Sequence, residues 1–97
     1  MRVRYTDTAA YDLKNGIEYL AEHAPLIAAE FAEAIERGVG ELVDFPFSAQ
    51  ETEKKGIRRK YVRRFHYSIF YAVEDEEIVI LYIKHAAQRL PWEDGGC

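Results

Sequence analysis

Between residues 67 and 83 the chain contains two runs of alternating hydrophobic and aromatic residues. In the first run, one set of alternate positions is Tyr67, Ile69, Tyr71 and Val73, and the other includes Phe70 and Ala72. In the second run, Ile78, Ile80 and Tyr82 alternate with Val79, Leu81 and Ile83. A period of two is typical of β-strands, because successive side chains point to opposite faces of a sheet. Each run therefore predicts a strand.

The two predicted strands are joined by residues 74–77, Glu-Asp-Glu-Glu. Four acidic side chains in a row favour solvent, so this segment predicts an exposed turn and an antiparallel hairpin. Upstream, residues 57–65 mix β-forming residues with arginine and lysine, as in a strand with one side facing solvent or an anionic partner. These segments together predict a three-stranded antiparallel meander.

Both faces of the predicted hairpin are apolar, whereas a small antiparallel sheet usually has one polar face. Helices from the first half of the chain can cover one face. The other face needs the C-terminal tail, a second copy of the chain or a different protein to cover it. The pattern therefore indicates a chain that is bound by something, in a homo-oligomer or a hetero-oligomer.

The first half of the chain predicts one short strand and two helices. Residues 3–5 alternate between apolar and basic side chains, as in a strand that pairs with an edge of the meander. Thr6, Asp7 and Thr8 are typical of a helix start, and apolar residues at helical spacing continue this helix to about Glu22. Pro25 fits the first position of a second helix, which residues 45–47, Phe-Pro-Phe, bring to an end.

The predicted order of elements is β-α-α-β-β-β, with a polar loop over residues 48–56. This order predicts an α+β fold, with a helical hairpin packed on one face of a small antiparallel sheet. Residues 1–92 are expected to form a single domain, and residues 93–97 a frayed C-terminal tail. Trp92 is the expected anchor of the segment after the last strand.

Charge is distributed very unevenly along the 97 residues, although the net charge is only −4. Residues 54–64 contain seven basic side chains and no acidic one, which are Lys54, Lys55, Arg58, Arg59, Lys60, Arg63 and Arg64. The segments on either side are acidic. A basic segment in an otherwise acidic chain indicates an anionic partner, either nucleic acid or an acidic protein segment. A solvated strand edge that resists aggregation explains the same pattern equally well.

The cysteine count, the histidine spacing and the lengths of the apolar runs exclude several classes of protein. A single cysteine, Cys97, excludes an intramolecular disulfide, and the three histidines lack metal-ligand spacing, so we expect no metal and no cofactor. No apolar run is long enough to span a membrane, and no signal-peptide core follows the N-terminal arginines. These observations predict a cytoplasmic protein.

Several segments together resemble the RelE/ParE superfamily, the toxins of bacterial type II toxin–antitoxin modules. They are the order of elements, Phe45-Pro46 after the second helix, the run RRFHYSIFYAVEDEEIVILYIKH, and the arginine and aromatic residue after His85. The resemblance covers nearly the whole chain. It implies a small bacterial toxin that a cognate antitoxin neutralises by wrapping its C-terminal segment across the exposed faces of the toxin.

RelE-like members of this superfamily are ribosome-dependent messenger-RNA endonucleases. In their pattern an arginine follows the tyrosine that opens the third strand, and basic residues follow the last strand. This chain instead has Ser68 and Gln88 at those places. The set of ribonuclease residues is therefore incomplete, and the sequence favours a protein that is not an enzyme.

If the chain is a ribonuclease, the chemistry requires cations to hold the phosphate, a base for the 2′-hydroxyl and an acid for the leaving oxygen. Arg59 and Arg63 are then the candidate cations and His85 the candidate acid. Glu51 or Glu53 is the candidate base.

ParE-like members, the plasmid-stabilisation branch, resemble this chain more closely. A small residue after that tyrosine and a histidine at the end of the last strand are common among them. The resemblance implies an inhibitor of DNA gyrase that acts by protein–protein contact and needs no catalytic residues. Two alternatives remain: a RelE-like ribonuclease that acts on messenger RNA at the ribosome, and a weakly toxic remnant that only binds antitoxin.

The residues expected to contact a partner lie in the basic segment, at the end of the last strand and in the tail. They are Arg58, Arg59, Arg63, Arg64, Tyr67, His85, Arg89 and Trp92. Alternation along a strand divides the arginines between the two faces, and the sequence favours neither face for a partner.

Overall fold

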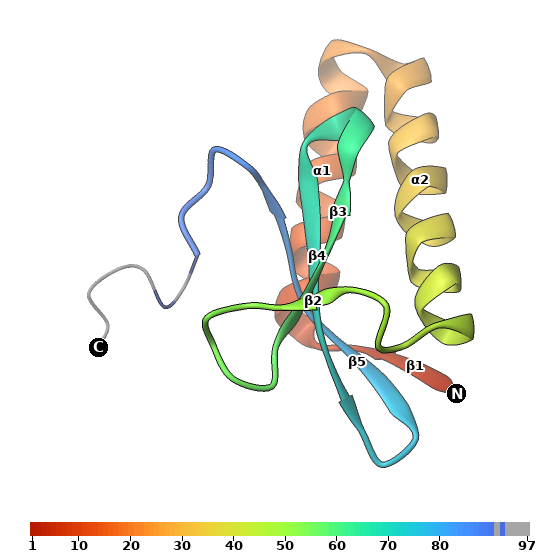
Figure 1. Ribbon diagram of the computed structural model, residues 1–97. Helices are drawn as coiled ribbons and strands as arrows, with labels where there is room; N and C mark the ends of the chain where they lie inside the picture. The colour runs from red at the N-terminus through yellow and green to blue at the C-terminus, as the bar shows by residue number, and fades with distance from the viewer. Residues whose placement is uncertain (91, 93–97) are drawn as a thin grey trace.

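The computed structural model describes residues 1–90 and residue 92. Two helices are followed by most of a five-stranded sheet (Figure 1). The elements are β1 (Arg2–Tyr5), α1 (Asp7–His23), α2 (Pro25–Asp44), β2 (Gln50–Glu51), β3 (Arg58–Val62), the 3-10 helix η1 (Arg63–Phe65), β4 (Tyr67–Glu74) and β5 (Glu77–His85). The predicted α+β class and the order of its main elements are confirmed.

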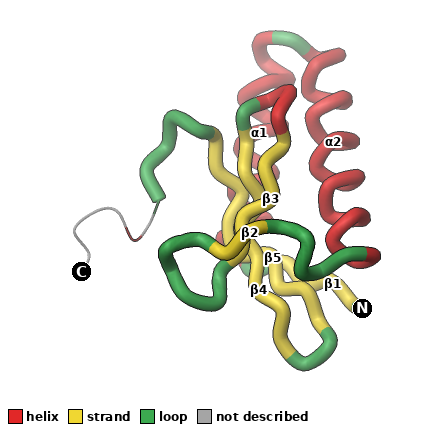
Figure 2. Tube along the Cα trace, viewed as in Figure 1, coloured by secondary structure: helices red, strands yellow, loops and turns green. Residues whose placement is uncertain are grey.

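The helices begin and end as the local sequence dictates. The Thr6 hydroxyl accepts a hydrogen bond from the Ala9 amide at 3.0 Å and so caps α1. Ala24 separates the helices, and Pro25 occupies the first turn of α2, where its missing N–H costs nothing. Figure 2 shows the two helices side by side against the sheet.

The helices cover one face of the sheet and form the core with it. A Cβ added to Gly16 of α1 would lie 3.1 Å from the Phe31 ring of α2, so glycine allows the two helices to approach closely. The buried core side chains come from both helices and from β4 and β5. They are Ala9, Phe31, Ile35, Val39, Leu42, Ile69, Tyr71, Ile78, Ile80 and Ile83.

The sheet differs from the all-antiparallel prediction in one pair of strands. Its order is β1-β5-β4-β3-β2, and β1 lies parallel to β5, with Val3 opposite Ile78 and Tyr5 opposite Ile80. The sheet is therefore mixed. A parallel pair needs a long connection, and α1, α2 and the meander between the two strands provide it.

The predicted alternation in the last strand is wrong beyond Ile80, because β5 contains a β-bulge. Tyr71 pairs with Ile80 and Phe70 pairs with Tyr82, which leaves Leu81 as an extra residue on β5. The bulge places Ile83 on the same face as Ile80, against the helices. The Leu81 carbonyl accepts a hydrogen bond from the Thr6 hydroxyl at 3.1 Å, which ties this irregularity to the start of α1.

Three local features also differ from, or sharpen, the predictions. The predicted strand over residues 57–65 ends at Val62, where η1 begins, and β2 lies within the predicted polar loop. The acidic turn between β4 and β5 is a tight one, since only Asp75 and Glu76 lie outside the strands and both have positive φ. The predicted tail over residues 93–97 lies outside the described residues.

Candidate partner-binding surface

The face of the sheet opposite the helices combines basic and aromatic side chains. In the register of β3 and β4, Arg59 lies opposite Phe70 and Tyr61 lies opposite Ser68. Directly opposed residues point to the same side of a sheet, so these four side chains share a face. Ile69 and Tyr71 alternate with them and lie in the core against the helices. We call the face with Arg59 the open face.

The neighbouring basic residues of β3 point to the helix side and are occupied there. Arg58 donates a hydrogen bond to the Ala49 carbonyl at 2.7 Å, and its guanidinium lies 5.1 Å from the centre of the Phe47 ring. Lys60 forms an ion pair with Glu41 of α2. Hydrogen bonding from Lys60, together with its charge, lowers the pKa of the Glu41 carboxyl. These two cations fasten β3 to the helical layer.

Arg59 has a different environment on the open face. Its Nε donates a hydrogen bond to the Ser68 hydroxyl at 2.7 Å, and its guanidinium lies 5.4 Å from the centre of the Tyr61 ring. Ser68 is 3% exposed and is the one buried polar residue in the described part of the chain. Among the described residues, Arg59 forms an ion pair with no carboxylate.

The two arginines of η1 lie beyond the end of β3. Arg64 donates a hydrogen bond to Glu30 of α2 at 2.6 Å and lies over the Phe65 ring. Arg63 is exposed, and its carbonyl accepts a hydrogen bond from the His66 amide at 3.2 Å. His66 adopts the left-handed conformation that ends η1, and its Nδ1 lies 2.9 Å from the Tyr61 hydroxyl.

A small hollow of about 190 Å³ lies between Arg59 and the end of β5. Ser68, Lys84, His85 and Gln88 also line it, and none of its described lining residues is acidic. We call it the basic hollow.

Internal contacts occupy several polar groups of the basic hollow. Lys84 is paired at 3.2 Å with Asp12 of α1, which also accepts a hydrogen bond from the Ile83 amide. The Nδ1 atom of His85 accepts a hydrogen bond from the Ala87 amide at 3.0 Å, so the ring proton is on Nε2. The Gln88 side chain accepts a hydrogen bond from the His85 amide at 2.7 Å.

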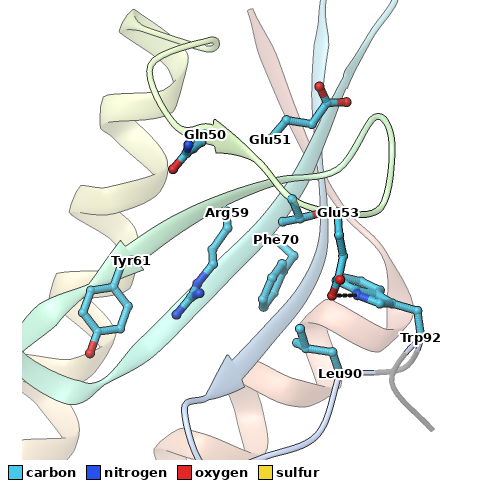
Figure 3. Close-up of a pocket in the computed structure, with 9 residues that line it drawn as sticks. Gln50, Glu51, Glu53, Arg59, Tyr61, Phe70, Leu90 and Trp92 are labelled. Atoms are coloured by element: carbon cyan, nitrogen blue, oxygen red, sulfur yellow. Dashed lines mark hydrogen bonds between the residues drawn. The ribbon is translucent and has the colours of Figure 1, made fainter. Parts of the chain in front are cut away.

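A second hollow, of about 500 Å³, shares Arg59 and Phe70 with the first (Figure 3). We call it the aromatic hollow, because Tyr61, Phe70 and Trp92 line it. The centre of the Trp92 ring lies 5.6 Å from that of Phe70 and 6.3 Å from that of Tyr82, both edge-to-face. Trp92 Nε1 donates a hydrogen bond to Glu53 at 3.2 Å, as the dashed line in Figure 3 shows.

The structure brings together only some of the residues expected to contact a partner. Arg59, His85 and Trp92 line the two adjoining hollows. Arg58 points to the helix side, and Arg63 and Arg64 belong to η1. Arg89 is exposed in the segment after β5.

Tyr67 lies on the helix side, where its ring packs 4.7 Å from that of Phe31 and 5.2 Å from that of His85. Burial raises the pKa of its phenol, with further contributions from Asp12 and Tyr19. This environment makes Tyr67 part of the packing between α1, α2 and β4. Its ring therefore lies on the side of the sheet opposite Arg59.

Sequence reasoning missed two features of this surface. The sequence marks Ser68 as the small residue where RelE-like chains have arginine, but it does not reveal that the Ser68 hydroxyl accepts a hydrogen bond from the Arg59 side chain. The alternation groups Tyr82 with Ile78 and Ile80 and does not reveal the bulge at Leu81. Because of the bulge, Tyr82 lies opposite Phe70 on the open face. Once the pairing of β3 with β4 is known, strand parity alone places Arg59 beside Ser68.

The described residues contain no group of three or more metal-ligating side chains placed to hold an ion. None of the described helices is both long enough and apolar enough to cross a bilayer.

Comparison with family models matched residues 3–90 to the ParE toxin of the type II toxin–antitoxin system parDE. This match covers most of the chain. The chain belongs to the ParE toxin family. A comparison with curated protein sequences found no match.

Solved structures similar to this ParE toxin come from toxin–antitoxin systems. The chromosomal ParDE system from P. aeruginosa has a chain with 26% identity and a TM-score of 0.78, covering 88% of this chain and 95% of that one. The RelBE2 toxin–antitoxin complex from Mycobacterium tuberculosis gives 28% identity and a TM-score of 0.57, with 87% and 95% covered. The isolated E. coli RelE toxin has the same fold at 10% identity, with a TM-score of 0.66 and 95% and 90% covered.

Proposed function

We propose that this ParE toxin inhibits DNA gyrase by protein–protein contact and is neutralised by a cognate antitoxin. Membership of the ParE family is the observation that carries the proposal. The open face supports it, because exposed Arg59 and Tyr61 lie beside buried Phe70, a combination of charge and apolar area that suits a protein partner. No cofactor or catalytic group of the toxin is needed for this mode of action.

The arrangement of the candidate catalytic residues argues against the alternative of a ribonuclease. Arg59 and His85 line one hollow, which favours that alternative, but Arg63 does not line it. Glu51 and Glu53, the candidate bases, line the aromatic hollow instead. They accept hydrogen bonds from the Gly56 amide and from Trp92. Arg59 borders both hollows, but neither candidate base shares a hollow with His85, and Arg63 lines neither of the two hollows.

The first experiment is induced expression of the chain alone in bacteria, with growth, DNA-damage signalling and transcript integrity scored in one culture. Gyrase inhibition predicts growth arrest with DNA-damage signalling and intact messages. Arrest with cleaved messages and no damage signal would replace this proposal with the ribonuclease. Normal growth with folded protein present would leave a remnant that binds antitoxin only. Co-expression of the antitoxin should restore growth.

A purified assay makes the target explicit. The toxin is added to DNA gyrase with relaxed plasmid, and supercoiling and cleaved-complex formation are followed on agarose gels. Relaxation of the supercoiled form of the same plasmid by a type I topoisomerase is the control, since an effect on both enzymes would indicate interference with DNA and not with gyrase. We expect loss of supercoiling with gyrase alone, and recovery when antitoxin is added.

Ser68→Arg separates the two activities in a single variant. The side chain at position 68 is buried beside Arg59, so a second guanidinium there would meet a like charge and lose the hydroxyl that Arg59 binds. We expect no RNA cleavage by this variant. Ribosome-dependent cleavage of messages by S68R, but not by the parent chain, would show that the remaining ribonuclease residues are in place.

A further inference from the structure

The two hollows on the open face differ in charge although they share a wall. The basic hollow is lined by Arg59, Lys84 and His85, and by no acidic residue among those described. The aromatic hollow contains Glu51 and Glu53 in addition to its rings. Figure 3 shows Arg59 between Tyr61 and Phe70, with its guanidinium directed away from the Glu51 carboxylate. Arg59 is thus the cation at the boundary between the two hollows.

Arg59 is held in one orientation by two contacts. The buried Ser68 hydroxyl accepts a hydrogen bond from Nε, and the Tyr61 ring lies against the guanidinium. No described contact uses the two terminal nitrogens. A guanidinium fixed at Nε and at one face keeps these donors in a rigid pair, which matches the two oxygens of a carboxylate.

The other charged groups around the hollows already have partners within the chain. Lys84 is paired with Asp12, Glu53 accepts from Trp92, and Glu51 accepts from the Gly56 amide. Arg59 therefore presents the main positive charge available to an incoming anion at this boundary.

We propose that Arg59, positioned by Ser68, binds a carboxylate of the antitoxin in the basic hollow, while a neighbouring apolar side chain of the antitoxin enters the aromatic hollow. This inference rests on the proposed neutralisation by antitoxin. It adds the chemistry of the contact: an acidic residue adjacent to a large apolar one. It also assigns Ser68 as the positioning residue for Arg59.

Charge and size favour a carboxylate over a nucleic-acid phosphate. The basic hollow of about 190 Å³ accommodates a side chain more readily than a nucleotide. A nucleic-acid strand carries a negative charge at every residue, and Glu51 and Glu53 in the adjoining hollow would repel it. A protein segment carries a carboxylate at one residue and an apolar side chain at the next, which matches the two hollows.

The test measures binding of purified cognate antitoxin by calorimetry to four variants of the full chain. Arg59→Lys keeps the charge and removes the paired donors, and we expect affinity to fall about tenfold. Ser68→Ala releases Arg59, with an expected loss of about fivefold, and Ser68→Thr, which restores a hydroxyl, should recover most of it. Arg37→Lys is the matched control, because Arg37 is exposed on α2, and it should change affinity by less than about twofold.

A double variant separates positioning from a structural effect. If Ser68 acts only through Arg59, Ser68→Ala should add almost nothing in the Arg59→Lys background. Additive losses would overturn the positioning role. Trp92, the single tryptophan of the chain, gives a local signal, and its emission should change on antitoxin binding in the parent chain.

The outcomes distinguish this inference from the proposed function. Antitoxin binding that is unchanged by both Arg59→Lys and Ser68→Ala would overturn the inference and leave neutralisation by antitoxin intact. Failure of the parent chain to bind antitoxin would overturn both. Tight binding of a 12-nucleotide single-stranded RNA that Arg59→Lys abolishes, with antitoxin binding unaffected, would assign the basic hollow to nucleic acid instead.

Discussion

Both faces of the sheet contain buried apolar side chains, but the two faces use them differently. On the helix side, Ile69, Tyr71 and Ile80 are completely buried against α1 and α2. On the open face, Phe70 and Val79 are 2% and 3% exposed, yet they lie outside that core cluster. Burial alone therefore does not distinguish a face that stabilises the fold from one that is available to a partner.

The difference lies in how each face satisfies its polar groups. On the helix side, the Tyr71 hydroxyl donates to the Pro46 carbonyl and Arg58 donates to the Ala49 carbonyl, so both are paired within the chain. On the open face, Arg59 is held by the Ser68 hydroxyl at Nε and by the Tyr61 ring, and it is paired with no carboxylate among the described residues. A surface that orients a cation without neutralising it is suited to recognition, because its partner supplies the missing charge.

The largest expected loss of stability comes from truncating a core side chain on the helix side. Ile80→Ala removes a completely buried side chain from the helix side, and we expect the free energy of unfolding to fall by about 2–5 kcal/mol. Urea denaturation followed by far-UV circular dichroism measures this loss. Leu26→Ala is the control, since Leu26 is 82% exposed and should change stability little. A loss below about 1 kcal/mol for Ile80→Ala would contradict the assignment of the core to this face.

The next largest loss of stability is expected at Asp12, whose side chain connects α1 to β5. Its carboxylate accepts from the Ile83 amide and from Lys84, and its side chain is 8% exposed. Asp12→Ala leaves both donors without this partner, and we expect a loss of about 2–3 kcal/mol in urea denaturation. Glu77→Ala, which breaks the exposed pair with Arg4, should cost less than about 1 kcal/mol. Equal losses would mean that burial of the Asp12 pair contributes nothing.

Alkaline pH should lower the stability of the fold through the buried phenols on the helix side. Burial raises the pKa of the Tyr67 and Tyr71 phenols, so the folded state favours their neutral forms. This contribution is fully present below the ordinary phenol pKa of about 10 and is lost as pH rises through the raised values. Urea midpoints between pH 8 and about pH 11.5 should therefore fall.

Tyr71→Phe tests this pH dependence directly. The variant should lose about 1 kcal/mol at pH 8, because the hydrogen bond to Pro46 is removed. It should also show a shallower decline above pH 10 than the parent chain, since one titrating phenol is gone. An identical decline in both proteins would show that Tyr71 does not contribute to the alkaline transition.

The smallest effect on stability should come from the open face. Trp92→Phe keeps an aromatic ring over Phe70 and removes the donor to Glu53, so we expect a loss of no more than about 1 kcal/mol. Glu53→Gln, which retains an acceptor, should change stability even less. A loss as large as that of Ile80→Ala would mean that the segment around Trp92 belongs to the core, and would remove the contrast between the two faces.

Sequence patterns predicted the elements of this fold well where one physical cause dominates. Capping by Thr6, the position of Pro25 and the acidic turn at residues 74–77 depend on local chemistry, and each was placed correctly within a few residues. The early end of β3 and the two residues of β2 were missed. Short pairings of this kind depend on a neighbouring strand, which the local sequence does not contain.

The candidate site was predicted only in part, for a similar reason. The basic segment was evident, but the sequence could not divide its arginines by function. Strand pairing sends Arg58 to the helix side and Arg59 to the open face, and Arg63 belongs to η1, beyond the end of β3. The contacts of Arg59 with Ser68 and of Trp92 with Phe70 join residues from different elements.

By itself, the sequence determined the α+β class, the helical hairpin, the central β-hairpin and the resemblance to RelE/ParE toxins. These follow from periodicity, capping and turn chemistry, which act over a few residues. Only the tertiary structure decided the parallel pairing of β1, the bulge at Leu81 and the place of Arg59 at the boundary of two hollows. Each of these depends on the register between strands, and register is fixed by packing of the whole sheet against the helices and not by the strand sequence alone.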